Sequence, residues 1–298
     1  MTDERPTIRP VTLSRLAELT HACDTEPVTT EQLESDLDVS HRRARETILE
    51  ATRIGLLQET EIDDDQVYAT STIGGDFLAA ILAEDWYRVS TILESNSPHF
   101  AAFLDVVGDI APANITTVLE RLEETQQDTP YTYNQTSIDV MADWAERLGC
   151  VQRNAFTGRY YRPSPAGELS DFSTTLLDAY DNLEQTAGVN LRQRYLSIPQ
   201  LRETICERVR CARNEFDRTL IELCQQNVGK LELSGAPIDT AAKDAALGIK
   251  QIELADDDAL VSTSQSSQQV MAGVELYDKQ YYYLAVHDRE LTFETEAQ

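Results

Sequence analysis

At 298 residues the chain is long enough for two or three small domains, each with a core of its own. Its hydrophobic content of 41% is that of a folded protein, which excludes a disordered acidic tail. The formal net charge of −27 argues against a protein that coats DNA without sequence preference, because phosphate contacts by basic residues supply most of the affinity in such binding.

The basic residues are almost all arginine. Lysine occurs only at positions 230, 243, 250 and 279, so 21 of the 25 basic residues are Arg. Many carboxylates with few lysines resemble the proteins of halophilic archaea, whose cytoplasm holds molar salt; an acidic regulator from a mesophile is the alternative. At about 1 M salt the Debye length falls to roughly 3 Å, so repulsion between an acidic surface and DNA is screened and counterion release contributes little. Net charge therefore does not exclude DNA as a partner, provided that local basic clusters make the contact.

Other features of the sequence predict a cytoplasmic protein. The charged start MTDERPTIRP is unlike a signal peptide, and no apolar run approaches the 18 residues of a membrane span. The cysteines number five and include no CxxC pair, so we expect buried, reduced thiols and no metal site.

The segment Val28–Thr70, with the helix before it, has the outline of a helix-turn-helix followed by a β-hairpin. Apolar spacing predicts helices over Thr12–Ala22, Thr30–Leu37 and His41–Thr52, with a turn at Asp38–Ser40 and a helix stop at Gly55. Two strands, Leu56–Ile62 and Gln66–Thr70, flank the acidic tip Asp63–Asp65.

The helix predicted at His41–Thr52 is Arg-rich. Arg42, Arg43 and Arg45 fall outside its apolar stripe, in the N-terminal half through which recognition helices read base edges. A solvated arginine face on an ordinary helix is the alternative. The predicted DNA contacts of this segment are Ser40, His41, Arg42, Arg43, Arg45 and Thr47.

Two later segments repeat the outline without repeating the sequence. The second has helices at Ile115–Leu122 and Ser137–Leu148 and a hairpin turning at 154–158, where Arg153 and Arg159 either make a second DNA contact or are merely solvated. The third has helices at Ile198–Val209 and Ala212–Gln225, with strands predicted near 229–235, 251–254, 273–276 and 280–286.

The expected fold is mainly α with small β-hairpin wings (α+β), as tandem modules joined by helices. The predicted boundaries are an N-terminal module at 1–70, a helical linker at 71–110, a second module at 111–165, a helical connector at 166–195 and a third module at 196–298.

These outlines resemble the winged-helix superfamily, most clearly over Thr12–Thr70. The resemblance implies double-stranded DNA as partner and a role in transcriptional control. Some winged-helix proteins are instead adaptors between proteins, including acidic subunits of chromosome-condensing and plasmid-defence complexes, and this non-catalytic role is the alternative. The resemblance has no signature motif, so it assigns no residue a role.

Sequence motifs of enzymes are missing. The chain has no GxxxxGK[ST], GxGxxG, GxSxG or HExxH motif, and its four histidines are scattered. We therefore expect no catalysis, no cofactor and no metal. The long helical stretches at 72–95 and 169–187 offer surfaces for a homodimer or for a protein partner.

Overall fold

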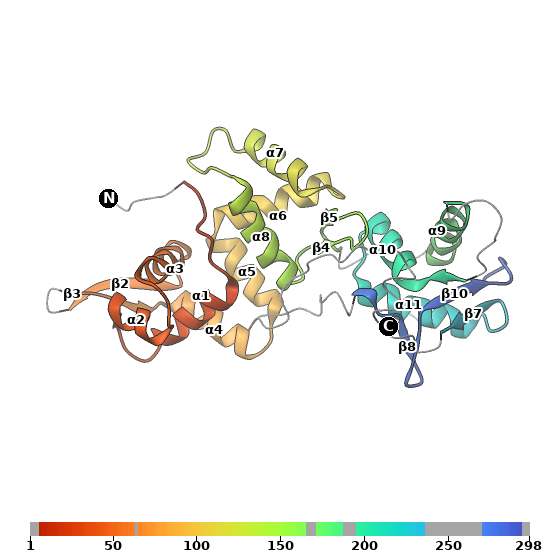
Figure 1. Cartoon of the computed structure of the whole chain (residues 1–298), viewed down its shortest axis with the longest axis horizontal. Coiled ribbons are helices and arrows are strands. Elements are labelled where there is room, and N and C mark those ends of the chain that lie inside the picture. Colours follow the sequence, from red (N-terminus) through yellow and green to blue (C-terminus); the bar gives the residue numbers. More distant parts are fainter. Residues whose placement is uncertain (1–5, 63–64, 165–170, 187–194, 236–269, 294–298) are drawn as a thin grey trace. The chain divides into compact units, whose positions relative to one another are not determined.

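A computed structural model describes residues 6–62, 65–164, 171–186, 195–235 and 270–293. They form two compact units, with the division between Val151 and Gln152; unit 1 precedes it and unit 2 follows it (Figure 1). These residues contain eleven helices and small antiparallel sheets of two or three strands, which confirms the predicted mainly helical α+β class. None of the described helices is long and apolar enough to cross a membrane.

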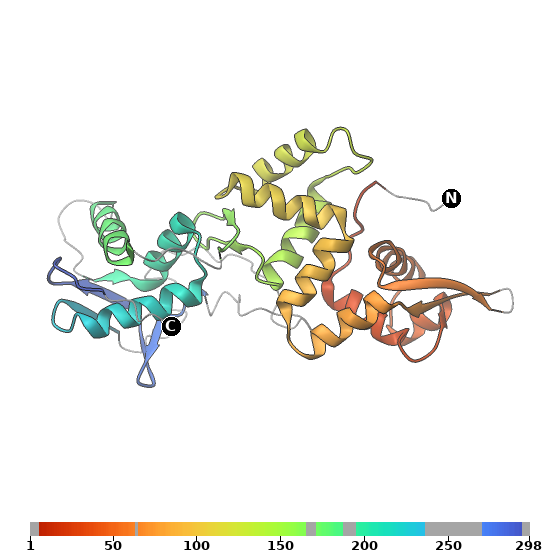
Figure 2. The same cartoon turned by 180° about the vertical axis from the view of Figure 1, so that it is seen from behind.

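Unit 1 begins with the predicted helix-turn-helix and hairpin. Its elements, in chain order, are α1 (Leu13–Ala22), β1 (Val28–Thr29), α2 (Thr30–Asp36), α3 (His41–Ile54), β2 (Leu57–Ile62) and β3 (Asp65–Thr70). The three strands form one antiparallel sheet in the order β1-β3-β2. The β2–β3 hairpin projects beyond helices α1 to α3 in both views (Figures 1 and 2). All the predicted elements are present within two residues of their expected ends, and only β1 was not predicted.

Local capping explains where these helices begin and end. The Thr29 hydroxyl accepts from the backbone N–H of Gln32, whose side chain accepts from the N–H of Thr29, and this capping box starts α2. Gly55 adopts the left-handed conformation, with φ of 82°, and ends α3 as predicted. Leu33 of α2 and Ile48 of α3 are fully buried, and the two helices pack against each other.

Five further helices complete unit 1: α4 (Thr72–Leu82), α5 (Trp86–Asn96), α6 (Pro98–Ile110), α7 (Ile115–Thr125) and α8 (Gln135–Arg147). Trp144 of α8 is fully buried against Phe100 of α6, and its indole N–H donates to the carbonyl of Val11 at 2.9 Å. This bond fixes the chain that leads into α1 against the helical layer.

Unit 2 contains β4 (Gln152–Arg153), β5 (Tyr160–Tyr161), α9 (Phe172–Thr186), β6 (Leu196–Ser197), α10 (Ile198–Val209), α11 (Arg213–Gln226), β7 (Leu231–Ser234), β8 (Val274–Leu276), β9 (Lys279–Tyr281) and β10 (Tyr283–Val286). The three-stranded sheet of unit 2 has the order β6-β10-β7, in which the last strand along the chain is central, as β3 is in unit 1. In both units the first strand of the sheet has two residues and is followed along the chain by two helices. Ser197 caps α10 as Thr29 caps α2. The segments from β1 to β3 and from β6 to β10 thus share one topology, and in unit 2 the β8–β9 hairpin stands before the last strand.

The predicted strand at 280–286 is two strands. Tyr281 ends β9, which pairs with β8, and Tyr283 begins β10, which pairs with β6 and β7. A Cβ on Gly273 would lie 1.9 Å from the carbonyl oxygen of Tyr281, so only glycine permits this backbone approach. The strand predicted at 251–254 lies outside the described residues.

The β4–β5 hairpin belongs to unit 2. The Asn154 side chain donates to the carbonyl of Glu203 at 3.0 Å, and Gln152 donates to the carbonyl of Cys211 at 3.1 Å. The hairpin predicted for the module at 111–165 therefore lies in unit 2, whereas α7 and α8 lie in unit 1.

Candidate nucleic-acid interface

The start of α3 is the most basic exposed part of unit 1. Ser40 occupies the N-cap position in an extended conformation, and its side chain makes no capping hydrogen bond. The first backbone N–H groups of α3 therefore lack a side-chain cap and leave the positive end of the helix dipole available to an anion.

The three predicted arginines of α3 are exposed, as expected. The Arg42 side chain is 86% exposed and forms an ion pair with Glu46 one turn later, at 3.2 Å between Nε and Oε1. In the part of the chain that the structure describes, the guanidinium groups of Arg43 and Arg45 make no hydrogen bond or ion pair. Two guanidinium groups therefore have their donors available for a ligand.

The other predicted contacts differ in accessibility. Ser40 and His41 are exposed, and the His41 ring is paired with Glu34 of α2. Thr47 is buried, and its hydroxyl donates to the carbonyl of Arg43 at 2.9 Å. Ser40 and the three arginines are therefore all exposed at the start of α3, and Ser40, Arg42 and Arg43 line one cavity, whereas Thr47 is buried.

Further along α3, a buried ionic cluster anchors the helix. Glu50 is fully buried, accepts from the backbone N–H of Arg9 at 3.1 Å and pairs with Arg53. Arg53 in turn donates to Nδ1 of His99 at 2.9 Å, and Nε2 of His99 lies 2.8 Å from the carbonyl of Pro6. Burial, and then the charge of Arg53, lower the pKa of His99 to about 4, so this ring is neutral and donates from Nε2.

Sequence reasoning missed this cluster. Its members come from residues 6–9, α3 and α6, which only the fold brings together. The one local signal is the spacing of Glu50 and Arg53, three apart on one helix face. The cluster ties the N-terminal segment and α6 to the predicted recognition helix.

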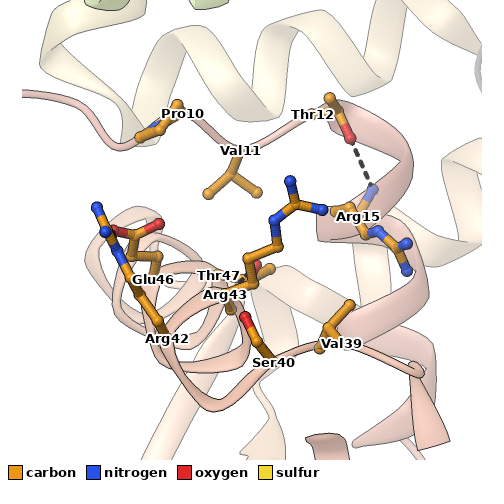
Figure 3. A pocket seen from close by; sticks show the side chains of 10 residues that line it. All are labelled: Pro10, Val11, Thr12, Arg15, Val39, Ser40, Arg42, Arg43, Glu46 and Thr47. Atoms are coloured by element: carbon orange, nitrogen blue, oxygen red, sulfur yellow. Dashed lines mark hydrogen bonds and ion pairs between the residues drawn. The ribbon is translucent and has the colours of Figure 1, made fainter.

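A cavity of about 590 Å³ opens beside the start of α3. Its polar lining consists of Thr12 and Arg15 at the start of α1, Ser40, and Arg42, Arg43, Glu46 and Thr47 of α3. Its apolar lining consists of Pro10, Val11 and Val39. Figure 3 shows the Arg43 side chain extended across the middle of the cavity, with Arg15 on one side and Arg42 with Glu46 on the other.

The β2–β3 hairpin offers no basic group. Residues 57–70 contain no Lys or Arg, and the exposed positions of the hairpin include Glu59, Glu61 and Asp65. Phosphate contact by this wing is therefore unfavourable. Within the first module, the start of α3 is the basic surface.

The hairpin arginines of unit 2 interact within the protein. The guanidinium of Arg159 pairs with Glu207, and that of Arg153 lies 5.9 Å from the centre of the Tyr160 ring. At the start of α11, Arg213 pairs with fully buried Glu203 and donates to the carbonyl of Arg153 at 2.6 Å. The β4–β5 hairpin therefore covers the start of α11, whereas the start of α3 in unit 1 is exposed.

Comparison of the chain with protein-family models, with curated proteins and with solved structures found no match. Among the described residues, no three His, Cys, Asp or Glu side chains are grouped so that they could hold a metal ion.

Proposed function

We propose that unit 1 binds double-stranded DNA through α3 and that the chain is a transcriptional regulator of a halophilic archaeon. The observation that carries this proposal is the cluster of Arg42, Arg43 and Arg45 at the exposed, uncapped start of the second helix of a helix-turn-helix. In a chain of net charge −27, three arginines within four residues are a local exception that favours an anionic partner.

The docking mode follows from the geometry of α3. Its N-terminal half enters the major groove, where Arg43 and Arg45 have donors available for guanine edges or phosphates. The unpaired N–H groups at the helix start approach a backbone phosphate. The topology of α1 to β3 supports this mode through its resemblance to winged-helix proteins. Arg153 and Arg159 remain predicted as a second contact, but the proposal does not depend on them.

The acidic surface sets the conditions for binding. At low salt the charge of −27 repels DNA, and at molar salt this repulsion is screened. Three arginines release few counterions, so we expect affinity to fall with salt much less steeply than for a protein with many phosphate contacts. Base contacts, worth about 1–3 kcal/mol for each bidentate pair, then supply most of the specificity.

Selection of binding sites from random duplexes, with the full chain in molar KCl, tests the proposal. We expect one enriched sequence, and a mobility shift with that duplex that the combined Arg42→Ala, Arg43→Ala and Arg45→Ala variant loses while it remains folded by circular dichroism. Unchanged DNA binding by this variant would sink the proposal.

The matched control removes the same charge elsewhere. Arg121, Arg208 and Arg218 have exposed side chains and lie on α7, α10 and α11. Their combined replacement by Ala is expected to leave the shift unchanged. An equal loss in both triple variants would mean that the overall charge, and not α3, determines binding.

A second candidate is an adaptor role for unit 2. Because the β4–β5 hairpin covers the start of α11, this helix presents no open N-terminal end to a groove. Unit 2 also exposes apolar side chains, Val228 at 84% and Tyr277 at 78%. Co-purification from the native host tests this role, and recovery of the chain without a stable protein partner counts against it.

A further inference from the structure

The cavity beside α3 has the composition of an anion site. Three of its lining side chains are arginines and one is a glutamate, so the cavity carries an excess of two positive charges in a strongly acidic chain. Arg15 donates to Glu18 at 2.7 Å and Arg42 pairs with Glu46. Arg43, which crosses the cavity in Figure 3, has no ion pair among the described residues. Its charge is therefore fully available to a ligand. Arg15 makes its two hydrogen bonds, to Glu18 and to the carbonyl of Leu37, from Nη1 alone, so its other donors are also left for a ligand.

The backbone adds donors to the same cavity. Thr12 and Ser40 are the N-cap residues of α1 and α3, so two helices begin at its wall. The Thr12 hydroxyl satisfies the N–H of Arg15, but Ser40 caps nothing. Helix starts add positive partial charge and N–H donors to those of the arginines.

The apolar wall and the volume define the rest of the ligand. Pro10, Val11 and Val39 offer nonpolar contact, and Val11 is held in place by the indole of Trp144. About 590 Å³ is far more than a bare phosphate or chloride needs, and it lies in the range of pockets for small organic ligands.

We propose that this cavity binds a small organic anion, with a phosphate or carboxylate head on Arg15 and Arg43 and a nonpolar body against Val11, and that the ligand regulates DNA binding. The regulatory half rests on the proposed function. The ligand head neutralises Arg43, which α3 otherwise presents to DNA, so occupancy of the cavity lowers the affinity for DNA.

Two arginines allow the proposed ligand site and the proposed DNA contact to be tested independently. Arg15 lines the cavity but lies on α1, whereas Arg45 lies on α3 but does not line the cavity. Arg15→Gln therefore impairs the proposed ligand site alone, and Arg45→Gln impairs the proposed DNA contact alone.

Calorimetry with the full chain tests the ligand site without DNA, using phenyl phosphate, benzoate and inorganic phosphate as probes. We expect phenyl phosphate or benzoate to bind more tightly than inorganic phosphate. Arg15→Gln is expected to weaken that binding by about tenfold or more, because a charge-assisted bond is lost, and Arg45→Gln to change it by less than about twofold. Absence of binding for all three probes, or equal weakening by both variants, overturns the ligand site. Inorganic phosphate binding as tightly as the best organic probe overturns the role of the nonpolar wall.

Fluorescence anisotropy with the selected duplex tests the regulatory half. The organic anion that binds best is expected to release DNA from the native chain but not from Arg15→Gln, which still binds the duplex. Ligand binding without any change in DNA affinity overturns regulation and leaves the site intact. If the chain binds no duplex, the proposed function and the regulatory half fail together, while the calorimetry still decides on the site.

Discussion

Glu50 is the residue whose replacement most sharply tests how α3 is held. Its carboxylate is fully buried between two cations: Arg9, which is also its backbone donor, and Arg53 one turn later on α3. Glu50→Ala removes the buried anion that Arg9 and Arg53 share. Because removal of one partner from a buried ion pair costs about 3–5 kcal/mol, the variant loses a large part of the stability of a typical domain.

Unfolding of unit 1 can be followed alone, because the two tryptophans of the chain, Trp86 and Trp144, both lie in it. For a domain of this size, with a urea dependence of about 1–3 kcal/mol per molar, the loss shifts the midpoint by about 2 M. Glu46→Ala, one turn earlier on the same helix, removes only the pair with the exposed Arg42 side chain and is expected to cost at most about 1 kcal/mol. Similar midpoints for the two variants would refute the reasoning.

Two further predictions use the same fluorescence measurement. A Cβ on Gly74 of α4 would lie 2.1 Å from the carbonyl oxygen of Leu56, whereas one on Gly75 meets nothing within 4 Å. Gly74→Ala is therefore expected to destabilise unit 1 by about 1–3 kcal/mol and Gly75→Ala to stabilise it by up to about 1 kcal/mol; the same sign for both would contradict this. Burial and the charge of Arg53 lower the pKa of His99 from 6.5 to about 4. Between these two pH values, His99 is therefore protonated in the unfolded chain but neutral in folded unit 1. Stability is thus lost at up to about 1.4 kcal/mol per pH unit as pH falls from 6.5 to 4, and an unchanged slope in His99→Gln would show that this histidine is not responsible.

The helices of unit 1 were predictable because their signals are local. The capping box of Thr29 and Gln32, the left-handed Gly55 and the apolar stripe of α3 all lie within or beside the helices that they define. Strand β1 was not predicted, because two residues are too few to show the apolar–polar alternation of a strand. It is defined by its pairing with β3.

The surroundings of the predicted site were not predictable, because they depend on contacts distant in sequence. The bond from Trp144 to Val11 spans 133 positions and fixes one wall of the cavity. Arg159 looked like a solvated or DNA-facing cation, yet its partner Glu207 lies 48 positions away. Charge patterns therefore located the basic cluster of α3, but not which other arginines the fold would pair.

The most direct measurement of the central claim compares one arginine in each unit. Arg45 of α3 and Arg218 of α11 are both exposed on the second helix of the shared topology. With the selected duplex in molar KCl, we expect Arg45→Ala to weaken binding by about 5- to 150-fold, the loss of about 1–3 kcal/mol, and Arg218→Ala to change it by less than about twofold. Equal affinities for the two variants would contradict the assignment of α3 as the DNA contact.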